Sequence, residues 1–299
     1  MSIRIAILTA AALAVIAPLA AAEQELSKRV NVAPDATIDV SNVQGSVDVT
    51  AWDRNEVELE AQLESDKDEL QFEATDRLVR IEVDRPEGKY HDSEEEDAIL
   101  TLRIPKGARL IVDTVSADIT VNGVRGEQRL ESVSGTVETQ AYDAPVSLQS
   151  VSGDVTVAGN GGKAQVSTEN VSGSTTASGI RGSFEGEVVS GNINATVAAT
   201  ERLRVRSVSG DVEVHADLTS SARVEMESIS GVVALTLKPP VNADFEIESF
   251  SGDIENCFGP RARDKNRYSP GSELNFTHGS GGARVQIQTL SGEINVCDR

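Results

Sequence analysis

The chain has 299 residues and a formal net charge of −21, with 27 Lys and Arg against 48 Asp and Glu. This acidity, without a long basic stripe, would repel a phosphate backbone, so nucleic acid is not an expected partner. Aromatic residues make up only 3% of the chain, which leaves few stacking platforms for a large sugar-binding cleft. The length is sufficient for one or two domains with a sizeable core.

Residues 1–22 have the features of a secretory signal peptide. Arg4 precedes an apolar run from Ile5 to Ala17, and small residues lead to a cleavage site expected after Ala22. The run is short and rich in alanine for a transmembrane span of about 20 strongly apolar residues, and an uncleaved anchor is the alternative. We therefore expect an exported protein, periplasmic or at the cell surface or extracellular, with no transmembrane segment in the mature chain. Removal of Arg4 would take the net charge from −21 to −22.

Residues 23–112 are predicted to form a β-rich N-terminal cap or subdomain. Apolar residues alternate in 57–63, 78–83 and 100–104, which indicates strands separated by proline-containing breaks. Residues 38–49 carry one copy of the pattern that repeats later in the chain. The acidic run 92–97 is most simply a solvated loop, although with His91 beside it weak binding of a divalent metal is an alternative.

Residues 113–299 contain a repeated Ser-Gly motif. The anchors lie 18 to 21 residues apart except for a last interval of 40 residues, and an earlier degenerate copy has Ala117 in the glycine position. Eight-fold repetition favours a structural role for the serine, because a catalytic nucleophile is normally unique. Acidic residues follow several of the glycines; we interpret them as a solvated turn surface rather than as a row of calcium ligands. The anchoring glycines are Gly135, Gly153, Gly173, Gly191, Gly210, Gly231, Gly252 and Gly292.

Apolar residues recur seven, five and two places before each glycine and two and four places after it. Steps of two are the period of a β-strand. The step of three would place the apolar residue two before the glycine on the opposite face, so we expect a bend there that returns it to the core. Each module is then two short strands joined by a corner.

A single module cannot bury its own apolar face, which favours an all-β, β-helix-like solenoid of two-strand modules stacked on one another. Nine anchors in register at about 4.8 Å per step would span roughly 38 Å. A twisted antiparallel sandwich of repeated hairpins is the competing arrangement.

The last long interval predicts an inserted loop over residues 258–282, which would leave the modules of Gly252 and Gly292 adjacent. Cys257 and Cys297 each lie five places after their glycine. On adjacent modules their Cα atoms would be about 5 Å apart, within disulfide range, and an exported protein favours oxidation. We therefore predict a Cys257–Cys297 disulfide.

The inserted segment also holds the densest basic patch of the chain. It is a candidate loop for binding an anionic partner, and pairing with the acidic surface of the same chain or simple solvation is the alternative. The patch consists of Arg261, Arg263, Lys265, Arg267 and Tyr268.

No catalytic residue, metal site or cofactor site is predicted. The three histidines stand in no recognisable motif, and the sequence contains no phosphate loop, metal-ligand spacing or nucleophile elbow. A carbohydrate-active β-helix enzyme, a lyase or hydrolase, is the alternative, motivated only by the expected architecture.

Several motifs in order resemble the bacterial putative-adhesin β-strand-repeat family, a domain of unknown function. They are the repeated Ser-Val-Ser-Gly-Asp-Val, the sequence from Leu102 to Gly107 and the terminal sequence from Gly281 to Ile294. The resemblance covers residues 38–299 and departs only at Ala117. It implies a β-solenoid on an exported bacterial protein and carries over no functional residue.

The sequence therefore predicts a non-catalytic, adhesin-like or envelope-associated interaction or scaffold module. Its partner is an unidentified protein or cell-envelope component.

Overall fold

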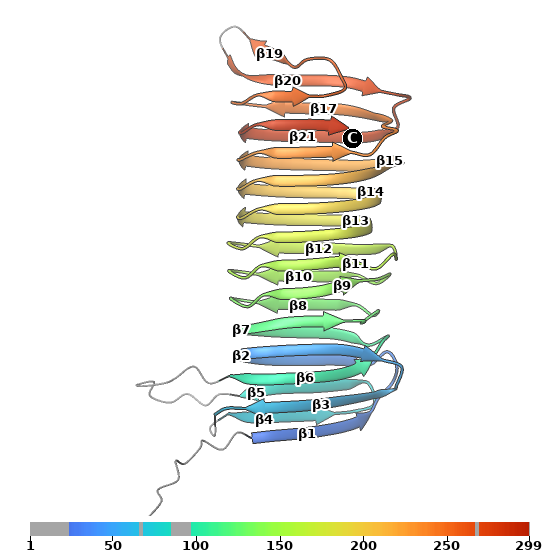
Figure 1. Ribbon diagram of the computed structural model, residues 1–299, viewed down its shortest axis with the longest axis vertical. Helices are drawn as coiled ribbons and strands as arrows, with labels where there is room; N and C mark the ends of the chain where they lie inside the picture. Colours follow the sequence, from blue (N-terminus) through green and yellow to red (C-terminus); the bar gives the residue numbers. More distant parts are fainter. Residues whose placement is uncertain (1–23, 66–67, 85–96, 267–268, 299) are drawn as a thin grey trace, which may run out of the picture.

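The structure is a computed structural model that describes residues 24–65, 68–84, 97–266 and 269–298. Every regular element in these ranges is a β-strand, and the strands pair into one 22-stranded sheet that folds as a tall stack (Figure 1). The prediction of an all-β fold is confirmed. Within these ranges, no helix is long and apolar enough to cross a membrane. The predicted signal peptide and most of the acidic run lie outside the described residues.

The strands that lead into the Ser-Gly corners stack on one another and form what we name the entry sheet. Neighbouring repeat strands are parallel and in register, with Leu148 beside Leu130, for example. In stacking order the sheet contains the first parts of β2 (Thr37–Trp52) and β7 (Arg109–Asn122), then β8 (Gln128–Ser132), β10 (Val146–Ser150), β12 (Ala164–Asn170), the last parts of β13 (Thr175–Ser190), β14 (Ile193–Ser209) and β15 (Val212–Ser230), then β21 (Ala283–Ser291) and β17 (Ala243–Ser249).

The strands that leave the corners form the exit sheet, which is also parallel and in register between repeats. The repeat modules therefore do not pair as antiparallel hairpins. In stacking order the exit sheet contains the last parts of β2 and β7, then β9 (Val137–Ala141), β11 (Val155–Gly159), the first parts of β13, β14 and β15, then β16 (Val233–Leu237), β22 (Ile294–Asp298) and β18 (Ile254–Asn256).

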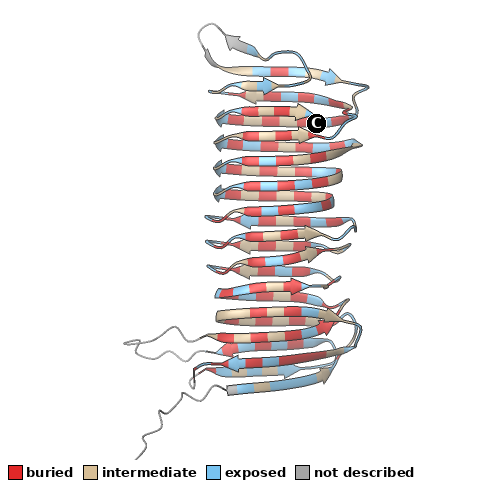
Figure 2. Ribbon diagram, in the orientation of Figure 1, coloured by how far each residue is buried: buried red, intermediate tan, exposed pale blue. Residues whose placement is uncertain are grey.

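The core lies between these two sheets. Buried and more exposed residues alternate along each strand (Figure 2), as the two-residue strand period requires. Leu130, Leu148 and Val155 are 0% exposed, and full burial of such a side chain contributes about 1.5–3 kcal/mol. Because each module covers the open side of its neighbour, the core runs continuously along the stack.

Glycine at the corner allows successive modules to approach closely. A Cβ added to Gly153 would lie 2.0 Å from the carbonyl oxygen of Gly135, and one added to Gly173 would lie 2.1 Å from that of Gly153. Such distances are far inside van der Waals contact, so a residue with a side chain would push the modules apart. At the degenerate first corner, Ala117 is 0% exposed and its own carbonyl lies under Gly135.

The part of the chain before the first Ser-Gly modules combines stacked and antiparallel strands. β5 (Leu78–Asp84) and β6 (Ala98–Pro105) pair in parallel with the two parts of β2, which itself lies in register with β7 although 72 residues separate Gly45 from Ala117. The end of the stack is covered by antiparallel strands, β1 (Gln24–Asn31) on β3 (Glu56–Leu63) and β4 (Glu69–Ala74) on β5. These antiparallel strands end the repeat.

At the other end, the prediction of a long loop over residues 258–282 is wrong for much of its length. The segment contains β19 (Arg263–Asn266) and β20 (Ser269–His278), and β20 pairs antiparallel with β17. Phe276 of β20 stacks on Phe245 of β17 with ring centroids 4.6 Å apart. The physical reason is the exposed edge of β17, whose unpaired backbone groups and aromatic side chain the returning strand covers.

The insertion also changes the stacking order. The final module, that of Gly292, lies between the modules of Gly231 and Gly252, because β21 pairs with β15 on one side and with β17 on the other. Cys257 and Cys297 form a disulfide with their Cα atoms 4.8 Å apart. The bond joins the two last modules of the exit sheet, where the Cys257 amide donates to the Val296 carbonyl at 3.0 Å.

We predict that Gly153→Ala destabilises the protein by about 2–3 kcal/mol, because the methyl group would meet a backbone carbonyl in the core of the stack. Gly161→Ala is the control: its Cβ would meet nothing within 4 Å, and only the φ of +84° opposes alanine, at about 1–2 kcal/mol. The measurement is urea unfolding followed by circular dichroism. Equal losses in both variants would contradict the close-approach argument.

We predict that the Cys257→Ser/Cys297→Ser variant loses about 2–4 kcal/mol of unfolding free energy, since the bond closes a 40-residue interval. Unfolding in urea with and without dithiothreitol measures it. The reductant should lower the stability of the wild-type protein and leave the double variant unchanged. An unchanged wild-type midpoint under full reduction would show that the bond contributes nothing.

Candidate functional site

A ladder of aliphatic side chains is exposed along the Ser-Gly corners. Each member lies two places before a corner residue, where the sequence led us to expect a core position, and that expectation is wrong. Among the large hydrophobic residues that the structure describes as exposed, only Leu78 lies elsewhere. In stacking order this aliphatic ladder consists of Val115, Val133, Val151, Val171, Val189, Val208, Ile229, Leu290 and Phe250, which are 42–54% exposed.

The reason is that strand alternation continues one step further than expected. The residue three places before the glycine faces inward instead, and its side chain hydrogen-bonds to the corner backbone. Ser132 Oγ accepts a hydrogen bond from the Gly135 amide at 2.8 Å, and Ser150 Oγ accepts one from the Gly153 amide at 2.9 Å. Asn170 plays the same part in the third of these corners. The inward polar residue therefore directs its aliphatic neighbour to solvent.

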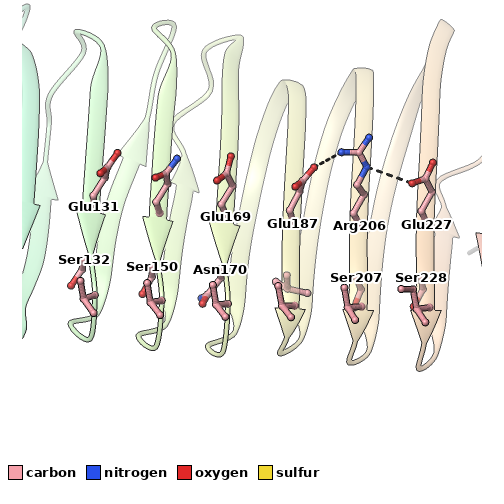
Figure 3. A pocket seen from close by; sticks show the side chains of 18 of the residues that line it. Glu131, Ser132, Ser150, Glu169, Asn170, Glu187, Arg206, Ser207, Glu227 and Ser228 are labelled. Carbon is pink, nitrogen blue, oxygen red and sulfur yellow. Dashed lines mark hydrogen bonds and ion pairs between the residues drawn. The ribbon is translucent and has the colours of Figure 1, made fainter. Parts of the chain in front are cut away.

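A groove of about 710 Å³ runs beside the ladder along seven successive modules. Its other wall is the row of side chains four places before the glycine, which stand side by side on adjacent strands in Figure 3. This row is mainly acidic. It consists of Asp113, Glu131, Gln149, Glu169, Glu187, Arg206 and Glu227.

The two ends of the acidic row differ in their electrostatic environment. Arg206 lies between Glu187 and Glu227, with nitrogen–oxygen distances of 2.5 Å and 3.5 Å (Figure 3). At the other end of the row, Asp113 is exposed but partly desolvated, which raises the pKa of its carboxyl, and the nearby carboxylates of Glu131 and Asp39 raise it further. Arg129 also lies 2.5 Å from Glu131, so the carboxylates of the row are partly neutralised by arginines toward both ends of the groove.

Comparison with known proteins identifies the family. The family described as Toastrack DUF4097 matches residues 36–297. The chain belongs to this family. The resemblance inferred from the Ser-Gly motifs is thereby confirmed, and the description of the Toastrack family names no activity.

Three solved structures are similar to this Toastrack chain at low sequence identity. A putative cell adhesion protein from Clostridium sporogenes is 11% identical, covers 93% of this chain and 100% of its own, and has a TM-score of 0.28. A putative adhesin from Bacteroides fragilis is 13% identical over 92% and 98%, with a TM-score of 0.42. One from Parabacteroides distasonis is 12% identical over 93% and 98%, with a TM-score of 0.27. No curated protein matches the chain.

The described lining of the Toastrack groove combines aliphatic side chains with a mainly acidic row. It contains no histidine, cysteine or lysine. The hydroxyls of Ser132 and Ser150 are engaged in the corner hydrogen bonds. His215 lies on the exit sheet, where its Nε2 is 3.0 Å from Glu213. Aliphatic contact and charge are therefore the chemistry that the groove presents.

The basic patch predicted from the sequence lies apart from this groove. Arg261 and Arg263 are exposed at the end of the stack where β19 covers β20. Arg267 and Tyr268 lie outside the described residues, as does the side chain of Lys265. The binding role of this patch stays a prediction.

Sequence reasoning missed the aliphatic ladder, although the signal was present. The odd step between the apolar places five and two before the glycine marks a change of face, and a Ser, Thr or Asn stands at the intervening inward place in most modules. That polar residue takes the core position that we assigned to the aliphatic one.

We predict that Asp113→Asn stabilises the protein at neutral pH. A raised pKa means that the ionised carboxyl is less favourable in the folded than in the unfolded chain. As the pH falls through that raised pKa, the wild-type group takes up its proton, and the difference should shrink and vanish below the ordinary value of 3.8. Thermal unfolding between pH 3 and pH 8 measures it.

Glu138→Gln, an exposed carboxylate of the exit sheet, removes the same charge and serves as the control. If Asp113→Asn were less stable than the wild type at neutral pH, the assigned environment of Asp113 would be wrong.

Proposed function

We propose that this Toastrack chain is a non-catalytic, exported interaction module whose corner groove binds a polypeptide segment bearing apolar and cationic side chains. The observation that carries the proposal is the aliphatic ladder beside the acidic row. A contiguous exposed apolar surface of this kind usually marks an interaction site in a soluble protein. The adhesin-like or envelope-associated role is the finer form of this proposal.

The backbone groups of the corners are already hydrogen-bonded between modules, so a partner would be recognised through its side chains rather than by adding a β-strand. The Val133 amide donates to the Thr114 carbonyl at 3.2 Å, and the Ser134 amide donates to the Val115 carbonyl at 2.8 Å. The same pairs repeat in the next two modules. Because these groups are already satisfied, a partner cannot lie in the groove as an additional β-strand. It must supply side chains to the ladder.

The charges of the groove select the partner. Five carboxylates stand along one wall against two arginines that pair with them, Arg206 within the row and Arg129 beside Glu131, so the wall keeps a negative excess in a chain whose net charge is −21. Such a field attracts cationic groups and speeds their association, and it opposes acidic partners. It also opposes pairing of the groove with a second copy of itself. An amphipathic helix with Lys or Arg beside an apolar stripe meets both requirements.

The remaining parts of the proposal concern architecture and location. We propose a β-solenoid over residues 113–299, a cap over residues 23–112 and a cleaved signal peptide over residues 1–22. The parallel, in-register pairing of the modules supports the solenoid. The Cys257–Cys297 disulfide supports an oxidising location, periplasmic or at the cell surface.

We predict that the mature protein binds a 20-residue helical peptide with a leucine stripe flanked by lysines. The groove spans seven modules, or about 29 Å at 4.8 Å per step, which is the length of such a helix. Fluorescence anisotropy at low and high salt measures it. We expect a dissociation constant near the micromolar range, about −8 kcal/mol, that weakens with salt.

The matched protein variants are Val151→Ser/Val171→Ser/Val189→Ser and Leu78→Ser. The first should weaken binding at least tenfold with little change in thermal stability, since its valines are 42–47% exposed. The second, at an exposed position off the ladder, should not weaken binding. Equal binding by the triple variant, or by a peptide with glutamates in place of lysines, would contradict the proposed groove. Turnover of cell-wall polysaccharides by the purified protein would contradict the non-catalytic assignment.

A further inference from the structure

Three arginines stand in register on the outer face of the entry sheet. Arg202 of β14 lies beside Arg223 of β15, which in turn lies beside Arg284 of β21. All three are exposed, and each is eight places before its corner glycine. They lie at the far end of the entry strands from the Ser-Gly corners, so this arginine row is separate from the corner groove.

The neighbouring arginines of β14 have carboxylate partners. Arg204 lies 2.5 Å from Glu225 and 3.8 Å from Glu185, on the modules to either side. Arg206 is bridged in the same way in the groove. Each of these two positive charges is therefore compensated by acids on adjacent strands.

The arginine row has no such direct pairing, although the charge of Arg202 contributes, after that of Arg204, to lowering the pKa of Glu225. Within the described part of the chain, no ion pair joins a carboxylate to Arg202, Arg223 or Arg284. Like charges directly opposite on adjacent strands are destabilising. An acidic residue at one of these three positions would remove the repulsion, and acidic residues are abundant in this chain. Asp244 is next to Arg284 in register and forms no ion pair with it in the described part of the chain; its Oδ1 accepts a hydrogen bond from Thr277 Oγ1 at 2.6 Å.

A hollow of about 390 Å³ opens between Arg202 and Arg223. Its other lining residues are Ser183, Thr219, Ser221 and Glu201. The Glu201 carboxylate is engaged by Lys163 at 2.7 Å, which reduces the negative charge that it presents to the hollow. Two arginines and the hydroxyls of Ser183 and Ser221 therefore line one hollow, whereas the Thr219 hydroxyl donates to the Thr200 carbonyl at 2.8 Å.

We propose that this hollow is a binding site for an oxyanion, a phosphate or sulfate group held by Arg202 and Arg223 with Arg284 adjacent. The planar guanidinium fork binds such groups in bidentate fashion, and the hydroxyls of Ser183 and Ser221 supply further donors. Bound anion would also relieve the repulsion within the arginine row. The site does not depend on the corner groove, and its ligand has the opposite charge.

The test is the stability of the mature protein titrated with sodium phosphate or sodium sulfate, with sodium chloride at matched ionic strength as reference. A ligand that binds only the folded chain raises its melting temperature in a saturable manner. We expect saturable stabilisation by phosphate or sulfate but not by chloride. In Arg202→Gln/Arg223→Gln the affinity should fall at least tenfold.

Arg80→Gln/Arg109→Gln is the matched control. It removes the same two charges from surface positions that are ion-paired with Asp39 and Glu127, and Arg109 also lies eight places before its corner residue. The control should retain the wild-type affinity. Equal affinity in wild type and the Arg202/Arg223 variant, or stabilisation without saturation in all proteins, would overturn the site.

The source of the phosphate group is resolved by two further ligands. Glycerol 3-phosphate represents a soluble ester, and vesicles of phosphatidylglycerol, compared with phosphatidylcholine, represent a lipid headgroup. Sedimentation with phosphatidylglycerol that is lost in the Arg202/Arg223 variant assigns the site to a membrane surface. Saturable binding of the soluble ester without sedimentation assigns it to a small phosphate ester.

Discussion

The close approach of successive Ser-Gly corners is the constraint on which this structure depends. With a hydrogen in place of a side chain, each corner glycine lies against the carbonyl of the previous corner, where a Cβ would come to about 2.0 Å in several modules. This contact fixes the distance and the register between modules. Once the corners stack, the strands on either side of them have to run parallel, and residues at equivalent places have to be neighbours.

Stacking of equivalent places has different consequences inside and outside the stack. Inside, aliphatic residues cover aliphatic residues, so modules that could not fold alone share one core. Outside, the same register builds rows of one chemical type. The aliphatic ladder, the acidic row of the groove and the arginine row all arise in this way. In such a protein, the residue type at one position of the module, repeated in successive modules, determines the chemistry of a whole row on the surface.

A parallel stack also leaves open edges at each end, and this chain covers three of these four edges with antiparallel strands; β18, the last described strand of the exit sheet, pairs only with β22. At the start β4 lies on β5 and β1 on β3; at the end β20 lies on β17. The terminal strand β20 brings Phe276 onto Phe245, which closes the last part of the core. Such pairing ends the repeat and protects the edge from pairing with other chains.

The sequence by itself determined the all-β class, the module length, the corner glycines and the equivalence of Cys257 and Cys297, because each of these is a property of local period and spacing. The tertiary structure decided the rest. That Val171 faces solvent depends on Asn170 turning inward to hold the Gly173 amide, and that the last module precedes that of Gly252 depends on which strand edges pair. A one-dimensional pattern gives the distance between residues along the chain. The face that a corner residue takes and the order in which strands stack are set by contacts between modules, so only the folded chain fixes them.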